Sequence, residues 1–362
     1  MNKYTICSFI IFLISNNLFS TDTNLVIKKR TFRKLFTEEP NEEPQQKHQK
    51  TESTPNFPMP LFNLTTPSGF NRTNSTSFTP ATPKKPIIHK KSIENILAEK
   101  KYSDVQKLNV QSAKAELYKA KNSDNESIIL KVFNINDRKS PKLNNEVREV
   151  KELNSPNVLM YKNHYYETTE KIFIIEMPFY EKGSLKSYLE KIVLSEQKIL
   201  SFIIDIATGL AEMARKKVCH LDMKPDNLLV DDNENILIAD FGKIKKFGQN
   251  ISSGGGGDAR YAAFEIKDHE TTANEKLDIV GFGFSILEIV STKPLPTANM
   301  NEFEKIRTDK EYVKSSYFDK VQLSEDLINL ILNMIDQKPH NRPSAQQIIE
   351  EANRLKRTHE SN

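Results

Sequence analysis

The sequence predicts an α+β fold in which a small strand-rich lobe precedes a larger helical lobe, with a disordered tail before both. Two short runs rich in β-branched and aromatic residues, SIILKVF (127–133) and KIFIIEM (171–177), indicate strands in the first lobe. Longer apolar patterns indicate helices in the second lobe, at 199–217, 280–290 and 327–335. Together these observations predict one folded region, preceded by a long segment that lacks such patterns.

The tail is predicted over residues 21–100 and is rich in Thr and Pro. Nine of the 17 prolines lie between 37 and 86, among many Ser, Asn and Gln residues and with little apolar periodicity. Such a composition buries too little apolar surface to offset the entropy lost on folding. We therefore expect residues 21–100 to be disordered.

The first 20 residues form an apolar segment with TICSFIIFLIS at its centre. This run fits the core of a signal peptide and is shorter than the ~20 apolar residues that a membrane span needs. The basic residues Lys28, Lys29 and Arg30 follow it, and they would keep the rest of the chain cytosolic if residues 5–19 anchored in a membrane. A cleaved signal peptide and a membrane anchor both remain open.

Composition excludes several classes of function. The net charge of +4 is mild for 362 residues, and no basic stretch is interleaved with aromatic residues, so we expect no nucleic-acid partner. The two cysteines, Cys7 and Cys219, are too few for a disulfide framework or a multi-cysteine zinc site.

The chemistry is concentrated in HLDMKPDNLLV (220–230), which places Asp222, Lys224 and Asn227 in one short loop. IADFGK follows, with Asp240 in D-F-G. The two motifs resemble the protein kinase catalytic loop H-R-D-x-x-x-x-N and its D-F-G partner. The resemblance implies a bilobal protein kinase fold over 103–355 that uses ATP and Mg²⁺. It makes Asp222 the base, Lys224 a charge beside the transferring phosphoryl group, and Asn227 and Asp240 the metal ligands.

The same resemblance extends to the nucleotide site. Lys131, in IILKV, stands at the place of the strand lysine, and Glu146 on the following helix stands at the place of its ion-pair partner. Met177 falls at the gatekeeper position, and the hinge falls near Pro178, Phe179 and Tyr180. These residues are therefore expected to bind the nucleotide.

The glycine-rich loop of the family is missing. Val110, Ser112 and Ala115 occupy the three positions where the family has glycine, and a side chain there restricts the approach of the backbone to phosphate. This leaves an alternative open, in which the chain is a pseudokinase that acts as a binding module with weakened nucleotide affinity. The four consecutive glycines at 254–257 follow D-F-G instead, and we expect them to form a flexible stretch with no contact role.

Further positions resemble the family's larger lobe. AFE (263–265) resembles A-P-E, and Arg342 in NRPSA resembles the arginine that pairs with its glutamate, here Glu265. Asp278 resembles the helix aspartate that braces the catalytic loop.

Three details resemble the Wee family of cell-cycle kinases: Leu221 in place of the arginine of H-R-D, Asp258 in GDARY where serine/threonine kinases usually have Thr, and the PLP segment at 294–296. This resemblance implies a monomeric kinase of the nucleus or cytoplasm that phosphorylates an inhibitory tyrosine on a cyclin-dependent kinase–cyclin complex. Lys224 alone would instead indicate a Ser/Thr acceptor.

The tail supports two opposite hypotheses. RKLF (33–36) resembles a cyclin-docking motif, and four threonines of the tail precede proline. However, NLT (63–65), NRT (71–73) and NST (74–76) are N-glycosylation sequons, which would be modified if the chain were a secreted kinase-like effector.

Overall fold

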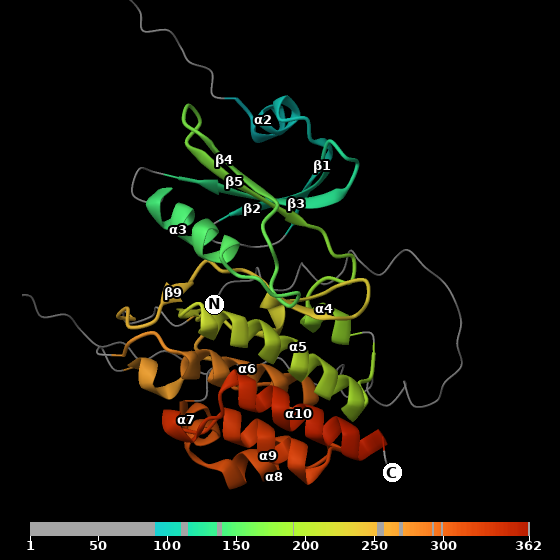
Figure 1. The fold of residues 1–362 in the computed structure, drawn as a ribbon, viewed down its shortest axis with the longest axis vertical. Coiled ribbons are helices and arrows are strands. Elements are labelled where there is room, and N and C mark those ends of the chain that lie inside the picture. The colour runs from blue at the N-terminus through green and yellow to red at the C-terminus, as the bar shows by residue number, and fades with distance from the viewer. Residues whose placement is uncertain are drawn as a thin grey trace, which may run out of the picture. The chain divides into compact units, whose positions relative to one another are not determined.

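The computed structural model has a five-stranded antiparallel sheet in its first lobe (Figure 1). The order across the sheet is β1-β2-β3-β5-β4. The described residues are 91–109, 115–135, 140–190, 192–251, 257–267, 271–291, 293–297 and 300–360. The strands of the sheet are β1 (Ser103–Leu108), β2 (Glu116–Lys121), β3 (Ser127–Asn134), β4 (Asn163–Glu167) and β5 (Ile172–Pro178).

Two helices lie on opposite faces of this sheet. Every second residue of β3, namely Ile128, Leu130 and Val132, is buried against α2 (Ile93–Glu99). The alternate residues of β3 face the other side, where α3 (Ser140–Lys151) packs. Because side chains alternate along a strand, Lys131 is on the α3 face.

Helix α2 lies inside the predicted tail of 21–100. Ser92 caps its N-terminus, and its Ile96 and Leu97 are buried against the sheet. The folded region therefore begins before the predicted start at residue 103, because a short amphipathic helix at the end of the tail covers the outer face of the sheet. Residues 1–90, with the apolar segment, the docking motif and the sequons, lie outside the described residues.

The second lobe is mostly helical, which confirms the α+β prediction. Its helices are α4 (Leu185–Leu189), α5 (Glu196–Arg215), α6 (Glu275–Val290), α7 (Met300–Thr308), α8 (Lys310–Tyr317), α9 (Glu325–Met334) and α10 (Ala345–Glu360). Short 3₁₀ turns are η2 (Pro225–Asn227), η3 (Phe264–Lys267) and η4 (Pro339–Asn341). Two small ladders pair β6 (Val218–Cys219) with β9 (Lys245–Lys246) and β7 (Leu228–Val230) with β8 (Ile236–Ile238).

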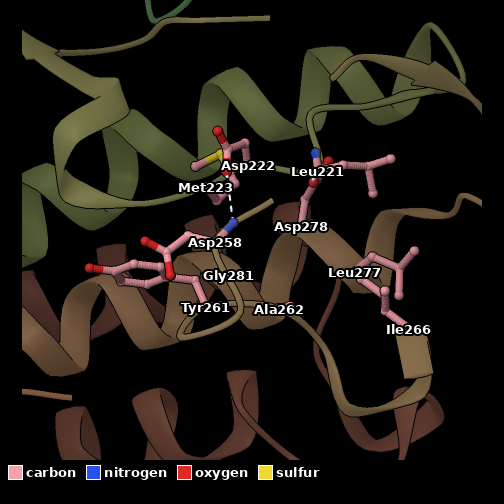
Figure 2. Close-up of a pocket in the computed structure, with 10 residues that line it drawn as sticks. All are labelled: Leu221, Asp222, Met223, Asp258, Tyr261, Ala262, Ile266, Leu277, Asp278 and Gly281. Carbon is pink, nitrogen blue, oxygen red and sulfur yellow. Dashed lines mark hydrogen bonds between the residues drawn. The ribbon is translucent and has the colours of Figure 1, made fainter. Parts of the chain in front are cut away.

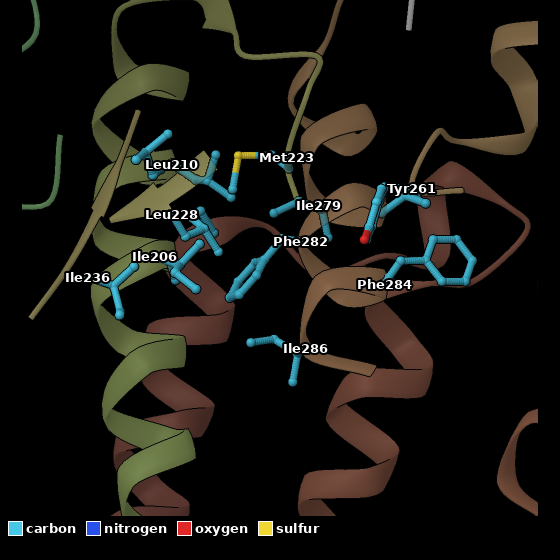
Figure 3. Packing of buried hydrophobic residues seen from close by; sticks show 14 of the residues in the cluster. Ile206, Leu210, Met223, Leu228, Ile236, Tyr261, Ile279, Phe282, Phe284 and Ile286 are labelled. Atoms are coloured by element: carbon cyan, nitrogen blue, oxygen red, sulfur yellow. The ribbon is translucent and has the colours of Figure 1, made fainter. Parts of the chain in front are cut away.

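Helix α6 forms the centre of this lobe. Its eleven residues from Leu277 to Leu287 are all buried, so neighbours cover it on every side. Figure 3 shows Phe282 pointing from α6 toward Ile206 on α5 and Leu228 on β7. This packing supports the loop between β6 and β7 from below.

Among the described helices, none has the length and apolar character that crossing a membrane requires.

Candidate active site

The loop between β6 and β7 carries the predicted catalytic residues, and α6 holds it in a strained conformation. Leu221 has a φ of +63°, a left-handed conformation that residues with a side chain rarely adopt. The buried Asp278 of α6 accepts hydrogen bonds from the backbone N–H groups of His220 and Leu221, both at 2.7 Å. This confirms the predicted bracing role of Asp278.

His220 joins the loop to the end of β8. Its Nδ1 accepts a hydrogen bond from the backbone N–H of Asp222 at 3.2 Å, so the ring proton lies on Nε2. Nε2 then donates to the carbonyl of Ala239 at 2.9 Å. The ring is fully buried, so His220 positions the loop and is not the base.

The structure brings the three predicted catalytic residues together around the carboxylate of Asp222. The Asn227 amide nitrogen donates to the Asp222 carbonyl at 2.7 Å and to Oδ2 at 3.2 Å, and Lys224 Nζ lies 3.7 Å from Oδ2. The backbone N–H of Asp258 donates to Oδ1 at 3.1 Å (Figure 2). Asp222 is thus held from three sides.

Lys131 reaches across to Asp240, with Nζ 2.6 Å from Oδ1. Desolvation would raise the pKa of Asp240, but the charge and hydrogen bond of Lys131 outweigh it and hold the pKa below its usual value. Asp240 therefore stays ionised at neutral pH.

The predicted ion pair of Lys131 with Glu146 is not the one that the structure has. Glu146 instead accepts a hydrogen bond from the buried Tyr161 hydroxyl at 2.9 Å, which needs an acceptor once it is removed from water. Glu146 still borders the site, because a Cβ placed on Gly242 would lie 3.5 Å from Asp240 Oδ1 and 3.9 Å from Glu146 Oε2.

The predicted metal ligands lie on neighbouring backbone segments. The N–H of Ala239, which precedes Asp240, donates to the carbonyl of Asn227 at 2.9 Å. The Asn227 amide nitrogen is used by Asp222, so its oxygen is the side-chain atom left to bind a cation. No group of three His, Cys, Asp or Glu in the described residues is arranged to hold a metal. These two oxygen donors suit Mg²⁺, which takes few protein ligands and completes its shell with phosphates and water.

The other predicted nucleotide residues are only partly described. Met177 and Pro178 end β5, and Tyr180 lies in the connection from β5 to α4, half-buried. Ala115 is buried immediately before β2, whereas Val110 and Ser112 lie outside the described residues.

The four glycines at 254–257 were predicted to be a flexible stretch with no contact role. This prediction is wrong for Gly257, and the other three lie outside the described residues. Gly257 has a φ of +78°, and a Cβ there would lie 2.3 Å from Asp222 Oδ1 and 2.6 Å from the Leu221 carbonyl oxygen. Only glycine allows the backbone to pass this close to the carboxylate. In the sequence, the one indication that Gly257 lies in the site is its place directly before Asp258.

Gly257→Ala is expected to lower the turnover of a phosphoryl acceptor by about 10²-fold, because the added methyl group must push the loop away from Asp222 by ~1 Å. The rate would be measured with saturating ATP. Gly248→Ala is the matched control, since Gly248 has a φ of +79° and nothing within 4 Å of its added Cβ. Equal rates for the two variants would contradict the close packing at Gly257.

Sequence reasoning missed the partners of Asp258. Arg260 donates to both of its carboxylate oxygens, from Nε at 3.1 Å and from Nη2 at 2.7 Å. Although burial would raise the pKa of Asp258, the hydrogen bonds from Arg260 keep it below its usual value. Tyr261 donates from its hydroxyl to Glu288, beside Arg260. Asp258 is therefore an ionised acceptor turned toward Arg260.

Comparisons with known proteins find a matching family and several relatives. Residues 111–352 match the family described as the protein kinase domain. A probable protein kinase of Dictyostelium discoideum is 28% identical over 242 residues, which cover 56% of this chain and 30% of that protein. Human serine/threonine-protein kinase Nek2 is 28% identical over 219 residues, covering 57% of this chain and 48% of Nek2. The Wee1-like protein kinase of Arabidopsis thaliana is 28% identical over 196 residues, covering 54% and 37%. The chain spans less than half the length of these three relatives.

Proposed function

This chain belongs to the protein kinase family, and we propose that it transfers the γ-phosphoryl group of ATP to a hydroxyl group of a protein substrate. The observation that carries the proposal is the set of contacts around Asp222, where Lys224, Asn227 and the backbone N–H of Asp258 meet one carboxylate. Such an arrangement orients a base toward an incoming hydroxyl.

Each residue then has a distinct task. Asp222 accepts the proton of the acceptor hydroxyl as its oxygen bonds to the γ-phosphorus and ADP leaves. Lys224, beside Asp222, would offset negative charge on the transferring group, and Lys131 on β3, beside Asp240, would bind the nucleotide phosphates. Magnesium ions, when bound, neutralise phosphate charge, and Asn227 and Asp240 would hold them.

We propose further that the acceptor is an inhibitory tyrosine of a cyclin-dependent kinase in complex with cyclin, and that the chain acts in the nucleus or cytoplasm. Two features support a departure from the usual Ser/Thr pattern. Asp258 is ionised and turned toward Arg260, so it cannot donate a hydrogen bond as a threonine hydroxyl would. Leu221 is buried and offers no cation for a phosphorylated loop. The similarity to the Wee1-like relative is a third support, although Nek2 is equally similar, at 28% identity.

The test is phosphoryl transfer from labelled ATP with magnesium by the full chain, using a cyclin-dependent kinase–cyclin complex and a generic Ser/Thr protein as acceptors. We expect phosphotyrosine on the complex. Lys131→Met should reduce the rate by about 10²–10³-fold, as the loss of a fixed charge at the phosphates does. Lys107→Met is the matched control, because Lys107 lies on β1 of the same sheet, where it is exposed and pairs with Glu116.

Each outcome is informative. Transfer to Ser or Thr alone would keep the kinase and remove the tyrosine acceptor. If neither acceptor is labelled and ATP gives no thermal stabilisation, the chain is a binding module and not an enzyme. Retained activity in Lys131→Met would overturn the role of this lysine.

A further inference from the structure

Helix α7 contributes a buried cation that the proposed chemistry does not use. Arg307 is 4% exposed, although arginine is seldom buried without a charged partner. Among the residues that the structure describes, no carboxylate forms an ion pair with its guanidinium. Burial lowers the pKa of Arg307 to about 10, which still leaves it charged at neutral pH.

The guanidinium is satisfied by the backbone of one loop. Nη2 donates to the carbonyls of Ala259 at 2.9 Å and Arg260 at 2.7 Å, and it lies 3.5 Å from the carbonyl of Ala262. Nη1 donates to the carbonyl of Phe303, one turn earlier on α7, at 3.0 Å. Arg307 therefore ties residues 259–262 to α7.

Two aromatic rings fix the guanidinium in place. Its central carbon lies 3.6 Å from the ring centre of Phe303 and 4.7 Å from that of Phe284, which belongs to α6. Such contacts favour a planar cation and leave its edge free to donate hydrogen bonds. The two rings thus hold the guanidinium so that its N–H groups point toward the carbonyls of residues 259–262.

The loop that Arg307 holds is adjacent in the chain to the residues that contact Asp222. Gly257 and Asp258 precede the residues that Arg307 binds, and they pack against Asp222 through a close backbone approach and the N–H bond of 3.1 Å. We propose that Arg307 is a positioning residue for the protein acceptor: by holding 259–262, it keeps Gly257 and Asp258 against Asp222, where the acceptor hydroxyl must arrive. This inference rests on the proposed kinase function.

Filling the space between the two rings does not by itself explain this residue. An unpaired buried cation is costly, and an apolar side chain of similar volume would fill the space between two phenylalanines at lower cost. What an apolar side chain cannot supply is hydrogen-bond donors for inward-facing carbonyls. Lysine offers a single ammonium group, which cannot span the same carbonyls with the geometry of a planar fork.

The test uses the full chain with Arg307→Lys and Arg307→Met. We expect the KM for the protein acceptor to rise or kcat to fall, by about 10²-fold in kcat/KM, because a shift of ~1 Å in the loop misplaces the acceptor. The KM for ATP should stay unchanged. Lys305→Met is the matched control, since Lys305 is an exposed cation on the same helix. Arg307→Lys should be impaired like Arg307→Met, because the charge alone does not replace the planar fork of donors.

A second readout does not depend on activity. Amide hydrogen exchange should become faster at residues 257–263 in both Arg307 variants, while protection in α6 and α9 stays as in the wild type. Unchanged exchange at 257–263, or a loss of protection throughout the second lobe, would overturn the positioning role. If the wild-type chain transfers no phosphate, the proposed function fails, and the exchange experiment still decides whether Arg307 holds this loop.

Discussion

Asp222→Asn is expected to lower kcat for phosphoryl transfer to protein by about 10²–10⁴-fold, the range found for a lost general base. The amide keeps the size of the side chain and one oxygen for the Asp258 N–H, but it cannot take up a proton at neutral pH. The measurement is single-turnover transfer from labelled ATP, with the thermal stabilisation by ATP recorded beside it. Stabilisation should persist, because Lys131 and Asp240 are unchanged.

The control for this variant lies in the same loop. Asp226 is an exposed carboxylate four residues along, with Lys186 Nζ 3.3 Å away, and Asp226→Asn should leave kcat close to the wild-type value. If Asp222→Asn retained the wild-type rate, another group would be the base. If it lost ATP stabilisation as well, the defect would lie in the nucleotide site and the result could not be assigned to proton transfer.

Arg342→Met is expected to cost about 3–5 kcal/mol of folding free energy, the range for removing one partner of a buried ion pair. The Arg342 side chain is fully buried and donates to both carboxylate oxygens of Glu265, at 2.6 and 2.9 Å. It also donates to the carbonyls of Asp336, Lys276 and Gln337. Its loss removes a donor from each of these acceptors, and the effect would be read as a shift of the urea unfolding midpoint.

Arg354→Met provides the comparison for the stability measurement. Arg354 pairs with two carboxylates, Glu351 and Asp326, but its side chain is 49% exposed. A surface pair of this kind contributes at most about 1 kcal/mol. Equal shifts for the two arginines would contradict a dominant role for burial. A smaller loss in Arg342→Met when combined with Glu265→Gln would show that the two side chains act as a pair.

Local patterns were sufficient for most of the fold. The β-branched and aromatic runs SIILKVF and KIFIIEM predicted β3 and β5 to within one residue, because such side chains favour strands. The long helices were predictable from their long apolar patterns. Helix α6 is buried on all sides, so its apolar run marks a central helix of the lobe. The short helix α2 was missed because seven residues between polar neighbours carry too weak a pattern.

The candidate site was predictable where its members are close in the sequence. Asp222, Lys224 and Asn227 lie within six consecutive positions of one loop, so a motif was enough to place them together. The pairing of Arg342 with Glu265 was expected from family resemblance and is confirmed, although 77 positions separate the two residues.

Motifs and periodicity thus predicted the kinase fold and the loop that brings Asp222, Lys224 and Asn227 together. Tertiary structure alone decided which carboxylate pairs with Lys131: Asp240 lies 109 positions away, while Glu146 accepts a hydrogen bond from Tyr161. It alone placed Gly257 against Asp222 and Arg307 beneath the same loop, across separations of 36 and 48 positions for the hydrogen bonds involved. Glycine and arginine have no characteristic spacing when they act through close approach or through backbone carbonyls, so only the packing of distant segments reveals them.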